Sequence, residues 1–265
     1  MKPRPELGRA ETTPSVDTSG FTLAGYRELL QTALAGGWSF IDFAEAGSAS
    51  APACLLRHDV DGDLAMAVQM AELESEIGVR ATYFLMLRSP LYNLLGCENF
   101  RLAQRLVELG HSIGLHYDNS FRPNPGRSRA EWIAAESKLL TEALDVDVQA
   151  FSFHQPPADI LERSPLRRPG LINVYDRELL SAYEYVSDSN MRWRGPSATE
   201  RFRSGTAQRL QLLIHPMWWA RDEPAPDPEA VFDEVIRSNV ERSQRQLLAT
   251  ERAYGPERRF LISRS

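Results

Sequence analysis

The stretch ACLLRHDVDGDLAMAVQMAELESEIGVRATYFLML, residues 53–87, decides the fold class. Its first residues, 53–58, form the short continuous apolar run that is typical of a buried strand. Asp63 is placed to cap a helix that runs to about Ile77, where Gly78 ends it. Residues 79–87 again have the composition of a strand. Strand–helix–strand units with continuously apolar strands are typical of a parallel sheet covered by helices.

The same alternation extends on both sides of this unit. Helices are predicted over 22–34, 99–110, 128–144 and 228–249, and further strands over 38–43, 111–117, 148–153, 171–175, 184–188 and 210–215. We therefore expect an α/β fold, preferably a closed or nearly closed (β/α) barrel, with an open doubly wound sheet as the alternative. No glycine-rich phosphate-binding motif follows any predicted strand.

Composition restricts the class of protein. The 265 residues are 43% hydrophobic and 25% charged, which is typical of a globular chain. With a net charge of −6 and no Lys/Arg-rich run, nucleic acid is not an expected partner. We expect no membrane span and, without the apolar region of a signal peptide near Met1, a cytoplasmic location. Residues 1–20 are expected to form a mobile arm and residues 21–265 a single barrel domain.

Histidines mark one end of the predicted sheet. The chain has five, and four of them stand where a predicted strand ends: His58, His116, His154 and His215. In an α/β barrel these strand ends form one face, on which active sites are built. His111 instead begins its strand, so we expect it to be structural.

Two carboxylates follow the strand that begins at residue 53. Asp59 and Asp61 are two positions apart, so in extended chain they project to the same side. Two carboxylates near imidazoles suit a divalent metal with a general base. Capping of the following helix is the alternative role for Asp61 and Asp63.

Six ordered blocks, spread over about residues 52–219, resemble the polysaccharide deacetylase (NodB-homology) family. They are LLRHDVDG (55–62), GVRATYF (78–84), ELGHSIGLHYD (108–118), FSFHQP (151–156), SDSNMRW (187–193) and LLIHPMWW (212–219). The resemblance implies a distorted (β/α) barrel with fewer than eight strands. It also implies a metal-dependent hydrolase that removes an acetyl or formyl group from the nitrogen of an amino sugar or related small amide.

The resemblance assigns catalytic roles. Asp59 would be the general base and Asp61 a metal ligand, here split as Asp-Val-Asp where the family usually has adjacent aspartates. His215 would be the general acid, and Asp188 the aspartate that tunes this histidine. The single barrel is accordingly expected to be a catalytic domain.

The metal ligands depart from the family's pattern at one position. His116 matches the first histidine ligand, but Ser120 stands where the second is expected. His154 is the favoured replacement, because one imidazole then replaces another. Asp118 and His58 are the other candidates. Zn²⁺ is the favoured cofactor, and Fe²⁺, Co²⁺ or Ni²⁺ also suit such ligands.

Substrate contacts are also implied. Trp218 and Trp219 are expected to line the cleft, where aromatic faces stack on sugar rings, and Arg57 is placed with them. The family's third motif has an arginine that orients the base, and Ser152 stands at about that place. The charge would then come from another arginine: Arg57, Arg192 or Arg194.

The expected partner is a small-molecule or glycan substrate, and three alternatives to the deacylase remain open. One is a metal-dependent amidohydrolase or esterase that acts on a non-sugar substrate. Another is a metal-free pseudoenzyme that binds a glycan or a partner protein. The third is iron-dependent oxidation at a site with two histidines and one carboxylate.

Overall fold

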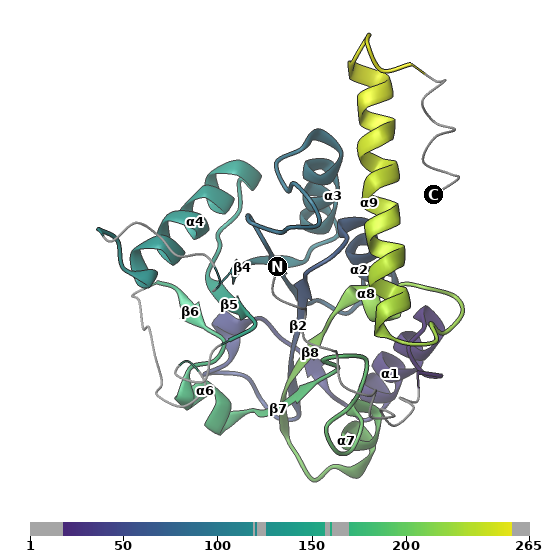
Figure 1. Cartoon of the computed structure of the whole chain (residues 1–265). Helices are drawn as coiled ribbons and strands as arrows, with labels where there is room; N and C mark the ends of the chain where they lie inside the picture. The colour runs from purple at the N-terminus through teal and green to yellow at the C-terminus, as the bar shows by residue number, and fades with distance from the viewer. Residues whose placement is uncertain (1–17, 119, 121–125, 157–159, 161–169, 256–265) are drawn as a thin grey trace, which may run out of the picture.

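The structure is a computed structural model in which residues 18–118, 120, 126–156, 160 and 170–255 are described (Figure 1). The strands are β1 (Ser39–Phe40), β2 (Ala53–Val60), β3 (Thr82–Leu85), β4 (Ser112–Asp118), β5 (Ala150–His154), β6 (Ile172–Asn173), β7 (Glu184–Ser187) and β8 (Arg209–Ile214). The helices are α1 (Leu23–Ala35), the 3-10 helix η1 (Phe43–Glu45), α2 (Leu64–Glu76), α3 (Cys97–Glu108), α4 (Arg129–Leu144), α6 (Arg177–Ala182), α7 (Ala198–Ser204), α8 (Pro216–Trp219) and α9 (Pro228–Thr250). The arm expected at residues 1–20 lies largely outside the described residues.

One parallel sheet forms the body of the molecule. Seven strands follow one another in the order β6-β5-β4-β3-β2-β8-β7, and β1 pairs with β2 off this path. All described pairings are parallel, and β6 and β7 are not paired with each other. The expected distorted barrel is therefore confirmed, as a seven-stranded half-barrel with helices around it (Figure 1).

Most helices begin where the sequence places a cap. Thr22, Asp63 and Ser128 each accept a backbone N–H at the start of α1, α2 and α4. Such bonds satisfy amide groups that have no partner inside the helix. The largest differences are at the outer strands. The strands predicted over 38–43 and 171–175 shrink to the two-residue β1 and β6, and the short helices α6, α7 and α8 were not predicted.

Strand β2 lies in the interior of the sheet and carries the first motif. It pairs with β3 on one side and β8 on the other, and all eight of its residues are buried. It runs two residues beyond the predicted end. His58 is therefore inside the strand, and alternation turns its side chain away from the face that Arg57 and Asp59 share.

Helix α9 extends well beyond the barrel (Figure 1). It is attached along one side: Val231 and Val235 are fully buried, Asn239 donates to the carbonyl of Gly62, and Arg242 lies 2.7 Å from Asp63. Within the described ranges, no helix is both long enough and apolar enough to cross a membrane.

Candidate active site

A cavity of about 560 Å³ opens where the carboxyl ends of the strands meet. This is the end of the barrel at which α/β barrels carry their active sites. Most of the polar groups expected from the motifs reach it. The lining residues are Asp59, Asp61, Met86, Pro90, Leu91, His116, Phe153, His154, Gln155, Pro156, Tyr175, Tyr185, Ser187, Ser189, Asn190, Arg194, Leu213, His215, Trp218 and Phe232.

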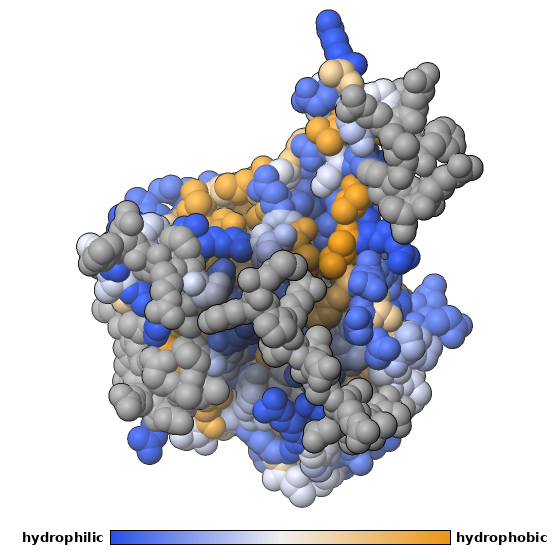
Figure 2. Space-filling view, viewed as in Figure 1, coloured by the Kyte–Doolittle hydropathy of each residue, from blue (hydrophilic) through white to orange (hydrophobic). Residues whose placement is uncertain are grey.

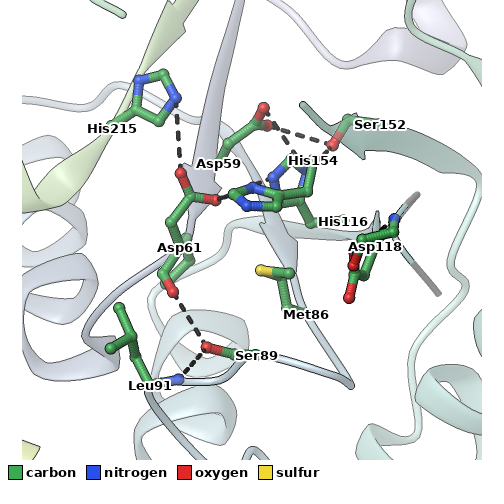
Figure 3. A network of polar contacts seen from close by, with 12 residues as sticks. Asp59, Asp61, Met86, Ser89, Leu91, His116, Asp118, Ser152, His154 and His215 are labelled. Carbon is green, nitrogen blue, oxygen red and sulfur yellow. Dashed lines mark hydrogen bonds and ion pairs between the residues drawn. The ribbon is translucent and has the colours of Figure 1, made fainter. Parts of the chain in front are cut away.

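Three side chains in this cavity form a candidate metal site. Asp61 directly follows β2, His116 lies on β4 and His154 ends β5. Nε2 of His116 is 3.0 Å from Oδ1 of Asp61, and Nδ1 of His154 is 3.2 Å from the same oxygen. One ligand atom from each residue lies within 4.8 Å of the others (Figure 3). Two imidazole nitrogens thus converge on one carboxylate oxygen.

The charges in this cluster stabilise an ionised Asp61. Burial raises the pKa of its carboxyl, but hydrogen bonds from His116 and His154 and the charges of His116 and His215 outweigh burial, so the net pKa is far below its usual range. The same hydrogen bond, opposed in part by burial, raises the pKa of His154. The pair interaction therefore favours a carboxylate beside imidazole nitrogens, which are the ligand types that Zn²⁺ and related ions take.

The other nitrogen of His116 is held by Ser152. These residues are register partners on β4 and β5, and Nδ1 of His116 is 2.6 Å from Oγ of Ser152. The serine hydroxyl in turn donates to Oδ1 of Asp59 over 3.3 Å. Because the hydroxyl hydrogen of Ser152 is used in the hydrogen bond to Asp59, its oxygen accepts a hydrogen bond from Nδ1–H of His116. This arrangement fixes the ring so that Nε2 of His116 faces Asp61, and a metal ion bound there would take the place of the proton on Nε2.

Asp59 is held by a buried arginine. Nη2 of Arg57 donates to Oδ2 of Asp59 over 2.9 Å and to the hydroxyl oxygen of Tyr175 over 2.8 Å. Burial lowers the pKa of the guanidinium, but the charge of Asp59 more than offsets this effect and the net pKa is raised. The guanidinium carbon also lies 4.8 Å from the ring centroid of Tyr175 and 5.9 Å from that of Tyr185. Arg57 therefore supplies the positive charge beside Asp59 that an arginine at position 152 was expected to provide.

His215 forms a second acid–base pair on the opposite wall. It directly follows β8, and its Nδ1 is 2.5 Å from Oδ1 of the fully buried Asp188, which follows β7. The indole nitrogen of Trp219 donates to Oδ2 of Asp188 over 2.7 Å. Burial lowers the pKa of His215, but Asp188 and Asp61 outweigh it and raise the pKa to about 9. His215 therefore carries a proton at neutral pH.

The two other candidate metal ligands do not join the cluster. Asp118 lies beside His154 in register, but its carboxylate accepts from the backbone and side chain of Ser120. His58 lies on the other face of the sheet, where its Nε2 is 2.6 Å from Oε1 of Glu74. Both are absent from the one group of candidate ligands in the described part of the chain.

Only some of the residues expected to contact the substrate line the cavity. Trp218 lines the cavity, whereas Trp219 is 3% exposed and points to Asp188 instead. Arg57 is fully buried and is not among the lining residues, so the geometry places it with Asp59 and not at the expected substrate contacts. Arg194 does line the cavity, and Arg192 does not.

The sequence did not predict several of the residues that line the cavity. Tyr175 and Tyr185 stand in predicted strands and line the cavity beside Arg57, and Phe232 reaches it from α9. Tyr175 had a signal, because it ends an apolar run in the same way as the histidines do. Phe232 had none, since its helical spacing with Ile236 is equally typical of a core-facing stripe.

No family model and no curated protein matches this sequence. Sixteen chains of solved structures match. A family 4 acetyl xylan esterase from Clostridium thermocellum, in complex with a cobalt ion, is 14% identical with a TM-score of 0.40, over 72% of this chain and 84% of that one. A chitin deacetylase from Colletotrichum lindemuthianum is 15% identical with a TM-score of 0.41, over 72% and 82%.

A mutant of a peptidoglycan deacetylase from Bacillus subtilis is 12% identical with a TM-score of 0.38, over 76% of this chain and 96% of that chain. These proteins are of the kind that the six motifs resemble. Identities this low do not transfer an activity to this chain, so its function is inferred from its own residues.

Proposed function

We propose that this chain is a metal-dependent hydrolase that removes an acyl group, acetyl or formyl, from the nitrogen of an amino sugar or a related small amide. The observation that carries the proposal is the convergence of three groups in one cavity. They are the Asp61–His116–His154 cluster, the Asp59 side chain held by Arg57, and the protonated His215 held by Asp188. A metal, a base and an acid are what hydrolysis of an amide requires.

The ligand set suits a divalent transition metal. Its two imidazoles and one carboxylate leave positions free for water and substrate, which is typical of catalytic zinc sites. A divalent ion bound there supplies a Lewis acid that polarises the amide carbonyl and lowers the pKa of a water molecule toward about 7. Zn²⁺ is our first choice, and Fe²⁺, Co²⁺ and Ni²⁺ take the same ligands.

Asp59 is the proposed general base. Its carboxylate lines the cavity, and Arg57 and Ser152 hold its two oxygens in place. It accepts the proton of the attacking water as the bond to the carbonyl carbon forms. Arg57 acts as a positioning residue, because it does not reach the cavity itself.

His215 is the proposed general acid. Its Nε2 is the ring nitrogen left free by Asp188, and it lies 3.9 Å from Oδ2 of Asp61, across the metal site from His116. It donates its proton to the leaving amine as the carbon–nitrogen bond breaks. Trp218 lines the same side of the cavity and offers an aromatic face to a sugar ring.

Elemental analysis and turnover together test this proposal. The purified chain, reconstituted with Zn²⁺ or Co²⁺, is expected to hold about one metal ion and to release acid from N-acylated amino sugars. His116→Ala and His154→Ala are expected to lose the metal, and Asp118→Ala is the matched control that keeps it. Asp59→Asn should hold metal without turnover. A chain that binds no metal would instead be a glycan- or partner-binding protein, and metal without hydrolysis of any amide or ester would also overturn the proposal.

A further inference from the structure

An apolar groove runs along the exposed side of α9. Figure 2 shows orange, apolar surface on this helix where it rises above the barrel. Four large apolar side chains on one side of the helix are 40–48% exposed: Phe232, Ile236, Val240 and Leu247. The loop between β3 and α3 forms the facing wall with Pro90 and Leu91, and encloses a hollow of about 330 Å³ with the helix.

Among the residues that the structure describes, the lining of this groove contains no charged side chain. It consists of Pro90, Leu91, Ile236, Asn239, Val240, Ser243, Gln244, Leu247 and Tyr254. The helix is strongly charged elsewhere, with Glu234 and Arg237 on either side of Ile236 in the sequence. A surface helix usually presents its charged residues to water and buries its apolar side. Here one apolar side is buried on the barrel and a second is left open.

The groove adjoins the active-site cavity. Pro90 and Leu91 line both hollows. Phe232, the first residue of the exposed apolar row, already lines the cavity, where it packs edge-on against Trp218 with ring centroids 5.5 Å apart. From Phe232 to Leu247 the helix rises about 22 Å. A molecule in the groove would therefore have one end among the metal-ligand candidates and the other near the tip of α9.

We propose that the substrate is an amphiphile, whose acylated polar head enters the cavity while a long hydrocarbon chain, fatty-acyl or isoprenoid, lies along α9. This inference rests on the proposed function and names the class of substrate for the same site. The uncharged lining suits a hydrocarbon chain without polar groups, and the distance from Phe232 to Leu247 suits a long hydrocarbon chain. The polar end of the cavity, with His215 and Arg194, suits the head.

A second copy of the chain is a poorer occupant. A stable protein interface usually involves about 20–30 residues a side, and this row offers four large side chains in a narrow hollow. A partner protein would also have no reason to follow a groove that leads into the cavity. The shared lining at Pro90 and Leu91 fits one ligand that occupies both spaces.

Binding of a matched pair of glycosides tests the inference without relying on turnover. The probes are methyl and dodecyl 2-acetamido-2-deoxy-β-D-glucoside, titrated calorimetrically below the micelle concentration of the dodecyl compound. Each buried methylene tightens binding about fourfold, so burial of about four of the added methylenes is enough for the dodecyl compound to bind at least about 100-fold more tightly. Ile236→Glu and Val240→Glu should each remove most of this ratio. Leu139→Glu, a leucine 44% exposed on α4, is the control that should leave it intact.

The outcomes separate the inference from the proposed function. A large ratio that only the α9 variants reduce supports the amphiphile, even if no acid is released, in which case the proposed hydrolase fails alone. Release of acid with equal binding of both glycosides overturns the amphiphile alone. Equal losses in Leu139→Glu indicate unspecific adsorption and overturn it. A dimer that Ile236→Glu dissociates, with no effect of the length of the hydrocarbon chain on binding, also overturns it. Binding of the hydrocarbon chain that appears only after removal of residues 256–265 overturns it as well.

Discussion

Nη2 of Arg57 donates to Oδ2 of Asp59 over 2.9 Å, and the two side chains are 0% and 3% exposed. A charge pair this deeply buried is stable only as a pair, because each charge alone would face the full cost of leaving water. The pair lies on one strand, two residues apart, so its geometry is built into β2 and does not depend on how distant elements pack.

Arg57→Met is expected to destabilise the chain by about 3–5 kcal/mol, because it leaves the carboxylate of Asp59 buried without its partner. The double variant Arg57→Met/Asp59→Asn should recover much of that loss, since it buries no unpaired charge. Urea unfolding of the wild type, both single variants and the double variant measures the coupling. Arg194→Met, at an exposed arginine, is the control and should change stability by less than about 0.5 kcal/mol. Additive losses would show that the two charges do not interact.

His215 should titrate unusually high in the metal-free protein. Asp188 raises its pKa to about 9 against the opposing effect of burial, compared with about 6.5 in an unfolded chain. The folded pKa is the higher one, so the contribution to stability is fully present below about pH 6.5 and is lost as the pH rises through 9. An NMR titration of the His215 ring measures the value directly.

Asp188→Asn provides the matched variant for that titration. Without the carboxylate the effect of burial remains, so the pKa of His215 should fall toward or below the unfolded value. Trp219→Phe removes only the indole donor to Oδ2 of Asp188 and should leave the pKa of His215 high. An unchanged pKa in Asp188→Asn would contradict the assignment of Asp188 as the tuning residue.

Replacement of His58 on β2 should mainly lower stability, whereas replacement of His154 on β5 should mainly remove the metal. His58 is fully buried with Glu74, which also accepts hydrogen bonds from Tyr26 and Tyr83. His58→Ala is expected to cost about 3–5 kcal/mol of stability, because the buried carboxylate of Glu74 loses the imidazole that it contacts over 2.6 Å, and to leave the metal content unchanged. His154, whose side chain is 27% exposed, should lose the metal when replaced by alanine, with a much smaller loss of stability.

Thermal unfolding and metal analysis of the same two samples check this pair. If His58→Ala lost metal while remaining folded, the candidate ligand set would be wrong. If His154→Ala unfolded the protein, His154 would be a structural residue.

The sequence predicted the sheet and most of the site because both depend on local pattern. Alternating strands and helices indicate parallel strands, and parallel strands bring their carboxyl ends together. That rule alone placed His116, His154 and His215 in one cavity. It failed for His58, because an apolar run shows where a strand begins more clearly than where it ends. Because β2 continues to Val60, His58 lies within the strand, and alternation turns its side chain away from the face of Asp59.

The contacts that were missed depend on long-range packing. The pairing of Arg57 with Asp59 was among the predicted alternatives, and residues two apart in a strand do share a face. Tyr175 meets the same guanidinium from 118 residues away, and no local pattern predicts that contact. The helical spacing of apolar residues on α9 can be seen in the sequence. The sequence does not show which of these residues pack against the barrel.

Ser152 should control how tightly the metal binds, although it is not a ligand. Its hydroxyl holds Nδ1 of His116 at 2.6 Å and donates to Asp59. Ser152→Ala leaves the Nδ1–H of a buried imidazole without an acceptor and lets the ring turn. Loss of such a partner typically weakens metal binding about 10- to 100-fold.

Competition with a chromophoric chelator measures the affinity of Ser152→Ala for Zn²⁺ or Co²⁺. Ser187→Ala is the matched control, because Ser187 lines the cavity but its hydroxyl pairs with Ser189, 2.6 Å away. Ser187→Ala should bind metal as the wild type does. If Ser152→Ala also did so, His116 would not need its Nδ1 contact to present Nε2. The chain of hydrogen bonds from His116 through Ser152 would then serve Asp59 alone, and the loss would appear in turnover and not in affinity.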